Sequence, residues 1–348
     1  MSDFGKVDKN FVVETKIEQE GLKFYNCLDG NFDIYGVYYE DGKFRRMPEK
    51  VAETVSEGVC RLHAHTAGGR IRFKTNSPYV AISVVLNKLD KWDHFAMTGF
   101  AGFDLYSNND YVRTFRPPPT TVDRYESVLD LPNEGLQEIT INMPLYSEVH
   151  ELYIGLDENA VIEKAEAYVN EKPVVYYGSS ITQGGCASRP GRSYQSIITR
   201  RFNCDHINLG FSGSAKGEDT MIDYIKNLEM SVFVYDYDFN APSVDHLEDT
   251  HEKMFKAIRE AHPDMPIIIM TAPKFIREEK FEARMRVIKK TYDNAVANGD
   301  KNVYFILGSD LMVLCGNEGT VDGTHPTDYG FASMAKVLGD LIEEHNLI

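Results

Sequence analysis

The stretch PVVYYGSSITQG, residues 173–184, decides the fold of the C-terminal half of this chain. It opens with an apolar run of strand length, and the glycine and serines that follow are typical of a tight turn. A buried strand that turns at once toward a helix is the first unit of an α/β domain with a parallel sheet. Ser180 lies in that turn, at the edge where such sheets place their active sites.

From this stretch to the C-terminus, apolar runs of strand length alternate with segments of helix length. The alternation predicts a parallel sheet covered by helices on both faces, which is a three-layer α/β/α domain. The loops that follow the strands then meet at one edge of the sheet. We expect strands at residues 174–177, 206–209, 232–235, 267–270 and 303–307, and helices at residues 194–202, 218–228, 246–261, 279–297 and 329–344.

The N-terminal half has a different pattern, in which apolar and polar residues alternate with a period of two. Runs of this kind occur at residues 70–75, 79–86, 136–144 and 149–155, and glycine, proline and asparagine separate them. Short strands with turn residues between them predict a β-sandwich or jelly roll.

The chain length favours two domains. A single core rarely grows to 348 residues. The boundary is expected in residues 157–172, where Glu and Ala dominate. We therefore predict a β-sandwich (jelly-roll-like) domain at residues 1–160 and the α/β catalytic domain at residues 161–348.

The charge and composition exclude several classes of partner. The formal net charge of −16 argues against nucleic acid and against an anionic membrane surface. No apolar run approaches the ~18 residues of a membrane span, and the first residues are polar. We expect a cytoplasmic protein that acts on a neutral or cationic ligand, and we leave open whether it forms a homo-oligomer.

The cysteines do not indicate a disulfide framework or a structural zinc site. There are 5 of them, an odd number, and no two form a Cys-x-x-Cys pair. No other group of potential metal ligands has a recognised spacing. We therefore expect neither a metal nor another cofactor.

Ser180 needs a base, because a serine hydroxyl is a poor nucleophile at neutral pH. The segment DGTHP, residues 322–326, offers one, since Asp322 and His325 lie in a tight turn just before the last predicted helix. In such a turn the carboxylate can reach Nδ1 of the imidazole, which leaves Nε2 for the serine. Taken singly, these are a serine of a turn and a histidine of a surface loop, and only their combination favours catalysis.

Two alternative nucleophile arrangements are disfavoured. An α/β-hydrolase elbow requires Gly-x-Ser-x-Gly, which neither residues 178–182 (GSSIT) nor residues 210–214 (GFSGS) supply. Cys186 is the only cysteine in a suitable loop, but no histidine is near it in sequence. Ser180, and not Cys186, occupies the position expected for the nucleophile.

Acyl transfer also needs hydrogen-bond donors for an oxyanion. The segment NLGFSG, residues 208–213, follows the second predicted strand, and a glycine there lets a backbone N–H approach a ligand. Asn240 follows the third strand, and its side-chain amide is a further donor. Glycine and asparagine after strands are usually plain turn residues, so these signals gain weight only beside the other motifs.

Taken in order, these segments resemble the four sequence blocks of the SGNH (GDSL-type) hydrolase superfamily. The resemblance implies Ser180 as the nucleophile, His325 as the base and Asp322 as the residue that orients the base. It also implies an oxyanion hole made of the Ser180 N–H, the Gly213 N–H and the Asn240 amide. The match extends over the whole C-terminal half.

Two positions depart from the pattern of that superfamily. Ser179 replaces the usual Asp of the first block, a residue that supports the loop rather than reacts. Residues 238–241 (DFNA) replace the Gly-x-Asn-Asp of the third block.

The segment GFDLY, residues 102–106, resembles the signature of a β-rich domain that precedes some SGNH esterases. Esterases of this build commonly remove O-acetyl groups from plant polysaccharides or their oligosaccharides, so the resemblance implies such a substrate. Trp92, the only tryptophan, is then a candidate sugar platform. Arg189 and Arg192, in the loop after the nucleophile, are candidates to bind sugar hydroxyls. The plainer interpretations are a core tryptophan and surface arginines.

The sequence thus predicts a metal-free serine esterase whose partner is an acetylated oligosaccharide substrate. A lipase or thioesterase with the same triad is the second hypothesis, which the lack of a long apolar lid segment disfavours. A carbohydrate-binding protein with an inactive hydrolase domain is the third, and the complete set of catalytic residue types argues against it.

Overall fold

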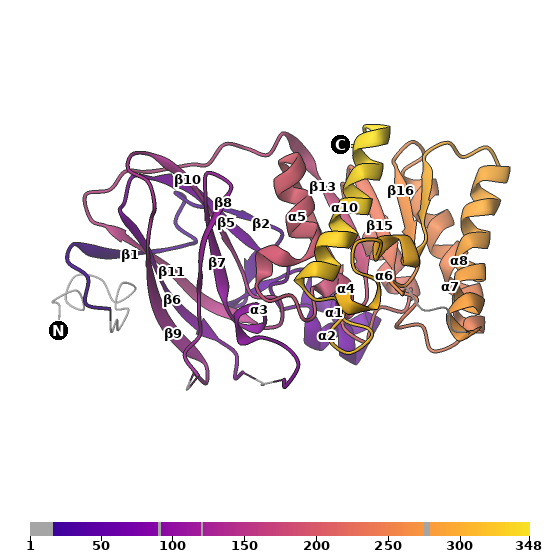
Figure 1. Ribbon diagram of the computed structural model, residues 1–348, viewed down its shortest axis with the longest axis horizontal. Coiled ribbons are helices and arrows are strands. Elements are labelled where there is room, and N and C mark those ends of the chain that lie inside the picture. Colours follow the sequence, from indigo (N-terminus) through magenta and orange to yellow (C-terminus); the bar gives the residue numbers. More distant parts are fainter. Residues whose placement is uncertain (1–16, 90–91, 120, 275–278) are drawn as a thin grey trace.

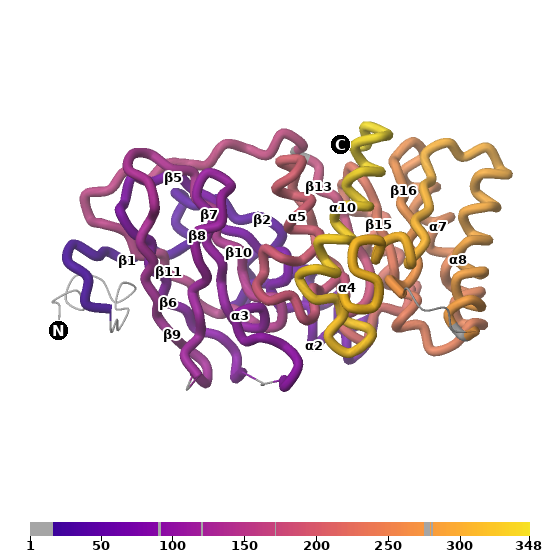
Figure 2. Tube along the Cα trace, viewed as in Figure 1, coloured from indigo at the N-terminus to yellow at the C-terminus, as the bar shows by residue number. Residues whose placement is uncertain are grey.

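A computed structural model of the chain describes residues 17–89, 92–119, 121–274 and 279–348. The N-terminal half is rich in strands, and in the C-terminal half helices flank a parallel sheet (Figure 1). The two halves lie side by side, and the trace in Figure 2 places the C-terminal helix near the middle of the molecule. This architecture confirms the fold class that the sequence pattern predicted.

Two antiparallel sheets build the β-rich half, and they share one apolar core. Phe73, Ile82 and Ile141 come from both sheets, are fully buried and belong to the same cluster. The strand order of the first sheet is β1 (Leu22–Asn26), β11 (Val149–Asp157), β6 (Tyr79–Leu86) and β9 (Arg124–Asp130). The order of the second is β12 (Ile162–Glu163), β5 (Arg70–Thr75), β10 (Gln137–Asn142), β7 (Phe103–Ser107) and β8 (Asp110–Phe115), with β2 (Asp33–Tyr35) paired to β5. Strands β3 (Tyr38–Glu40) and β4 (Lys43–Arg45) form a separate hairpin.

A five-stranded parallel sheet is the centre of the C-terminal half. Its strand order is β14 (Cys204–Gly210), β13 (Asn170–Gly178), β15 (Val232–Asp236), β16 (Ile267–Met270) and β17 (Val303–Ile306). The longer helices are α5 (Tyr194–Phe202), α6 (Asp219–Ile225), α7 (Val244–Ala261), α8 (Glu279–Ala297) and α10 (Asp328–His345). Short helical turns are α3 (Met97–Phe100), α4 (Ser180–Gln183), η3 (Pro190–Arg192), α9 (Gly308–Leu311) and η4 (Gly316–Gly319).

Strand β13 is buried on both faces, as its continuous apolar run predicted. Val174 and Tyr176 pack in the cluster that contains Ile198 of α5 and residues of α10. Val175 and Tyr177 pack in the other cluster, with residues of α6, α7 and α8. The loops after the parallel strands therefore open at one edge of a sheet that is covered on both sides.

Two helices of the N-terminal half belong to the core of the C-terminal half. Helix α1 (Glu49–Val55) places Ala52, and α2 (Glu57–Leu62) places Val59, in the same apolar cluster as Met221. The predicted β-sandwich domain therefore contributes helices to the apolar core of the α/β half, and a cut at residue 160 would not separate two independent cores. Each helix in the described part of the chain is too short or too polar to cross a lipid bilayer.

Candidate active site

Strand β13 ends at Gly178, and the turn after it leads directly into helix α4. Oγ of Ser179 caps this helix by accepting a hydrogen bond from the N–H of Ile181 at 3.2 Å. Gly178 has no room for a side chain, because a Cβ there would lie 2.2 Å from Oδ1 of Asp236. The turn thus holds Ser180 as the first residue of α4, at the carboxyl edge of the sheet.

Asp322 and His325 reach Ser180 from the loop that precedes α10. Nε2 of His325 lies 2.9 Å from Oγ of Ser180, and Nδ1 of the same ring lies 2.7 Å from Oδ2 of Asp322. Oδ1 of Asp322 accepts the backbone N–H groups of Thr324 and His325 at 2.9 and 2.8 Å. A hydroxyl, an imidazole and a carboxylate that orients the imidazole therefore form one hydrogen-bonded chain.

Asp322 is ionised at neutral pH. Burial raises the pKa of its carboxyl, but hydrogen bonds from the backbone and the imidazole of His325, and from the Thr324 N–H, lower the pKa to about 2 overall. The carboxylate holds the ring with Nε2 toward Ser180. It also stabilises the imidazolium that forms when Nε2 takes up a proton.

Gly213 lies in the turn after β14, and its N–H differs from those of its two neighbours. The flanking N–H groups are bonded, since Ser212 donates to Oε1 of Gln183 at 3.0 Å and Ser214 donates to the carbonyl of Phe211 at 2.9 Å. Within the described residues the Gly213 N–H has no such acceptor, and nothing lies within 4 Å of a Cβ built on this residue. Its φ of +69° is the left-handed conformation that favours glycine.

Asn240 follows β15 and lies against the same turn. Its Nδ2 donates to the carbonyl of Phe211 at 2.9 Å, which uses one amide hydrogen and leaves the other. The N–H of Ser180, at the first position of α4, likewise has no acceptor in the part of the chain that the structure describes. The three donors predicted for an oxyanion hole are therefore all available to a ligand.

A buried arginine from the β-rich half supports the Gly213 turn. Nη1 of Arg46 donates to the carbonyls of Asn208 and Gly210 at 2.9 and 2.7 Å. Burial lowers the pKa of Arg46 to about 9, so it remains a cation at neutral pH. Asn208 then joins this strand end to α4, because its Nδ2 donates to the carbonyl of Thr182 at 2.8 Å. No motif or spacing in the sequence marks Arg46, so its role could not be predicted there.

The β-rich half also reaches the nucleophile and its base. The hydroxyl of Tyr146 donates to the carbonyl of Ser180 at 3.2 Å. The ring of Trp92 packs edge-on against Tyr146 and stacks on His94, with centroids 5.3 and 5.9 Å apart. The ring of His94 lies 6.0 Å from that of His325. Trp92 is 41% exposed, so it lies at the mouth of the site, partly packed and partly open.

The segment GFDLY docks the β-rich half onto the loop that follows the nucleophile. The buried carboxylate of Asp104 accepts hydrogen bonds from Asn142 Nδ2 at 2.7 Å, Arg189 Nη1 at 2.7 Å and the Gly191 N–H at 2.8 Å. The hydroxyl of Tyr106 accepts a second bond from Arg189 at 2.7 Å. This motif therefore joins the two halves of the chain.

Neither arginine proposed for substrate binding contacts the triad. The Arg189 guanidinium is committed to Asp104 and lies 3.6 Å over the ring centroid of Tyr111, so it faces the β-rich half. Nε of Arg192 lies 3.5 Å from Asp328 of α10, and this side chain is one-third exposed. The geometry assigns Arg189 to domain docking, and a substrate contact for Arg192 stays a prediction.

Cys186 lies near the catalytic histidine although the two are far apart in sequence. A ligand-type atom of Cys186 and one of His325 lie within 4.8 Å of each other. Burial, followed by the charge of Asp322, raises the pKa of the Cys186 thiol to about 12. The thiol is therefore protonated at neutral pH and is a poor nucleophile.

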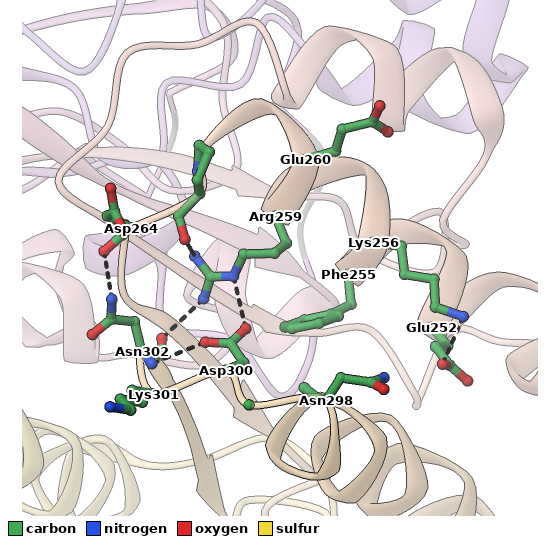
Figure 3. Close-up of a pocket in the computed structure, with 13 residues that line it drawn as sticks. Glu252, Phe255, Lys256, Arg259, Glu260, Asp264, Asn298, Asp300, Lys301 and Asn302 are labelled. Carbon is green, nitrogen blue, oxygen red and sulfur yellow. Dashed lines mark hydrogen bonds and ion pairs between the residues drawn. The ribbon is translucent and has the colours of Figure 1, made fainter.

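A surface hollow of about 590 Å³ lies far from this site, between the C-terminal ends of α7 and α8 (Figure 3). Arg259 lines this hollow, and its guanidinium donates several hydrogen bonds. It donates to Asp300 at 2.8 Å and to the carbonyls of His262, Met265 and Asn302 at 2.9, 2.5 and 3.1 Å. This arginine joins the loops that precede β16 and β17 at the amino ends of the strands. The residues of the hollow therefore have a structural role.

Two family models match the sequence, one in each half. The model described as the GDSL-like Lipase/Acylhydrolase family matches residues 171–343. The model named GxDLY, described as the N-terminus of Esterase_SGNH_hydro-type, matches residues 22–162. A search of curated proteins found no significant match.

Solved structures with this fold match nearly the whole chain. A protein described as a GDSL-like lipase, from Bacteroides ovatus, is 28% identical with a TM-score of 0.82, over 93% of this chain and 97% of that one. The salicylyl-acyltransferase SsfX3 from a tetracycline biosynthetic pathway is 19% identical, with a TM-score of 0.76 over 94% and 98%. A family two carbohydrate esterase from Clostridium thermocellum, in complex with cellohexaose, is 12% identical, with a TM-score of 0.63 over 93% and 100%. At these low identities, the last two matches indicate a shared fold and nothing further.

Proposed function

Because the chain belongs to the GDSL-like hydrolases with a GxDLY N-terminal domain, we propose that it is a serine esterase that removes O-acetyl groups from carbohydrate. The observation that carries the proposal is the hydrogen-bonded chain of Ser180, His325 and Asp322. The Gly213 N–H, which has no acceptor among the residues that the structure describes, lies in a turn that is bonded to α4 and supports the same reaction.

In the first step, Oγ of Ser180 attacks the acetyl carbonyl carbon while its proton passes to Nε2 of His325. The carbonyl oxygen becomes an oxyanion, which accepts hydrogen bonds from the Gly213 N–H and the Asn240 amide. When the intermediate collapses, the bond to the sugar oxygen breaks. That oxygen takes the proton from His325, and the acetyl group stays on Ser180.

In the second step, a water molecule takes the place of the sugar alcohol. His325 removes a proton from the water as the oxygen attacks the acetyl carbon, and the same donors receive the second oxyanion. Collapse breaks the bond to Oγ, which regains its proton from His325. Acetic acid leaves and the free enzyme is restored.

The openness of the site supports a small acyl group carried by a large alcohol. The side chains of His325 and Asp322 are 24% and 37% exposed, and Trp92 is 41% exposed at the mouth. An acetyl group can reach Ser180 from the surface, while the sugar that carries it remains outside against the Trp92 ring. A long acyl chain would need an apolar channel to cover it.

Acetate release tests this substrate class. The panel should contain acetylated mannan, xylan and monosaccharides, with long-chain acyl esters beside them and the Ser180→Ala variant as the control for chemical hydrolysis. The proposal predicts a kcat/KM for at least one acetylated oligosaccharide that exceeds the value for long-chain esters by roughly 10² or more. Faster cleavage of long-chain esters, with no acetate released from any sugar, would overturn it in favour of a lipase.

A further inference from the structure

Three potential metal ligands from distant parts of the chain meet beside the nucleophile. His94, Cys186 and His325 each offer one ligand atom, and these atoms all lie within 4.8 Å of one another. His94 belongs to a loop of the β-rich half, Cys186 to the loop after α4, and His325 to the loop before α10. Only the packing of the two halves brings the three together.

Each imidazole has a carboxylate beside its Nδ1, as metal-bound histidines commonly do. Nδ1 of His94 lies 3.0 Å from a carboxylate oxygen of Asp93, and Nδ1 of His325 lies 2.7 Å from Asp322. A carboxylate on one ring nitrogen fixes the ring and makes the other nitrogen more basic, as in many zinc sites. In each ring Nε2 is then the nitrogen left for a metal.

Two imidazole nitrogens and one sulfur are the donors that zinc prefers, and three protein ligands leave a fourth position for water. Zinc–ligand bonds of about 2.0–2.3 Å place tetrahedral ligand atoms roughly 3.3–3.7 Å apart. Because the three atoms lie within 4.8 Å of one another, they need to approach by about 1 Å at most. His94 has the freedom to do so, because its side chain is 35% exposed and one of its two neighbouring rings is the partly open Trp92.

We propose that Zn²⁺ binds His94, Cys186 and His325 and inhibits the enzyme reversibly. When the zinc–sulfur bond forms, the thiol proton leaves to solvent, and the two carboxylates on the imidazoles compensate the added positive charge. The metal occupies the lone pair of His325 Nε2 that otherwise receives the Ser180 proton. This inhibition rests on the proposed function, whereas the binding site itself does not.

Inhibition is measured as hydrolysis of an aryl acetate by protein first freed of metal with EDTA, then titrated with Zn²⁺ or Mg²⁺. The wild type should lose its activity with Zn²⁺, regain it with EDTA, and not respond to Mg²⁺. Cys186→Ser and His94→Phe each remove one ligand, and the phenyl ring keeps the stack on Trp92. Each variant should need at least about tenfold more Zn²⁺, relative to its own uninhibited rate. Cys315→Ser, which alters a cysteine outside the cluster, should behave as wild type.

Binding is measured separately with Co²⁺, whose bond to a thiolate gives a charge-transfer band in the near ultraviolet. The band should appear with one Co²⁺ per chain in the wild type and in Ser180→Ala, and it should be missing in Cys186→Ser. Absence of the band from the wild type, or equal zinc inhibition of wild type and Cys186→Ser, would overturn the site. The cobalt band does not depend on turnover, and it can be measured in Ser180→Ala. If the wild type proved inactive, the proposed function would be overturned, but the band would still show whether the metal site exists.

Discussion

At the scale of single residues, Ser180 depends on groups that hold one another in place. His325 is directed at its hydroxyl by Asp322, and the Tyr146 hydroxyl donates to its carbonyl at 3.2 Å. Asp322 in turn uses both oxygens, one on the imidazole and one on the backbone of its own turn. Substituting Asp322 or Tyr146 therefore removes a contact that positions His325 or Ser180.

Asn240→Ala is expected to lower kcat by roughly 10²–10³-fold, the usual loss for one oxyanion donor. KM should change little, because the amide acts mainly on charge that develops in the transition state. Steady-state kinetics on an aryl acetate measure both constants. Nδ2 also bonds the Phe211 carbonyl, so an unchanged melting temperature is the control for a displaced turn. A kcat close to that of the wild type would exclude the donor role.

At the scale of elements, the local pattern of apolar and polar residues is sufficient to predict the bounds of segments that bury their side chains at regular intervals. Strand 267–270 and helices 194–202 and 279–297 have the bounds that their periodicity predicted. The contact between Asp322 and His325 could also be predicted from the sequence. Both residues lie in one turn, so their contact depends on local geometry alone.

Contacts between distant segments could not be predicted in this way. Helices α1 and α2 have 7 and 6 residues, too few to show a helical period, and they are stabilised by packing on the catalytic core. His94 and Tyr146 reach the site from the other half of the chain. No spacing relates them to Ser180, so only tertiary packing reveals them.

The end of β15 contains a buried acid whose charge should shape the pH dependence of stability. Burial raises the pKa of Asp236 to about 8, although a hydrogen bond from Thr182 opposes the rise. Between about pH 4 and that value, the folded state keeps a proton that the unfolded chain has lost. The unfolded state binds fewer protons there, so the free energy of unfolding falls as the pH rises.

Asp236→Asn removes this titration while keeping the shape of the protonated acid. When the pH is raised across that range, the free energy of unfolding should fall less for the variant than for the wild type. The free energy of the variant minus that of the wild type should therefore rise steadily with pH. Urea unfolding at a series of pH values measures the effect. Parallel pH profiles of the two proteins would contradict a raised pKa at Asp236.

At the scale of the whole molecule, the two halves behave as one unit. One apolar cluster extends from the β-sheets to the face of the parallel sheet covered by α5 and α10. The buried carboxylate of Asp104 adds bonds to Arg189 and Gly191 across the junction. The fold therefore positions the β-rich half rigidly beside the active site.

Asp104→Ala should lower the free energy of unfolding by about 3 kcal/mol, because it leaves the Arg189 guanidinium without its partner in a mostly buried place. Lys336→Ala, which breaks an exposed ion pair with Asp340, is the matched control and should cost less than about 1 kcal/mol. Urea unfolding measures both. Equal effects of the two substitutions would show that the GFDLY contact does not join the halves.

Trp92→Ala should raise KM on an acetylated oligosaccharide roughly fivefold, since a stacked aromatic ring contributes about 1 kcal/mol. A small aryl acetate has no sugar to stack on the ring and should react nearly as before. Trp92→Phe keeps the packing on Tyr146 and should lose less. An equal loss on both substrates, together with a lowered melting temperature, would show that Trp92 serves the core rather than the substrate.

The central claim is that Ser180 is the nucleophile of an esterase. Reaction with a fluorophosphonate, followed by intact mass and peptide mapping, tests it most directly. The account predicts one adduct per chain, on Ser180, formed as the hydrolysis of an aryl acetate is lost. Ser180→Ala should give no adduct and no turnover while keeping the wild-type circular dichroism spectrum. An adduct on another residue, or a Ser180→Ala protein that retains more than a few per cent of the wild-type rate, would contradict the account.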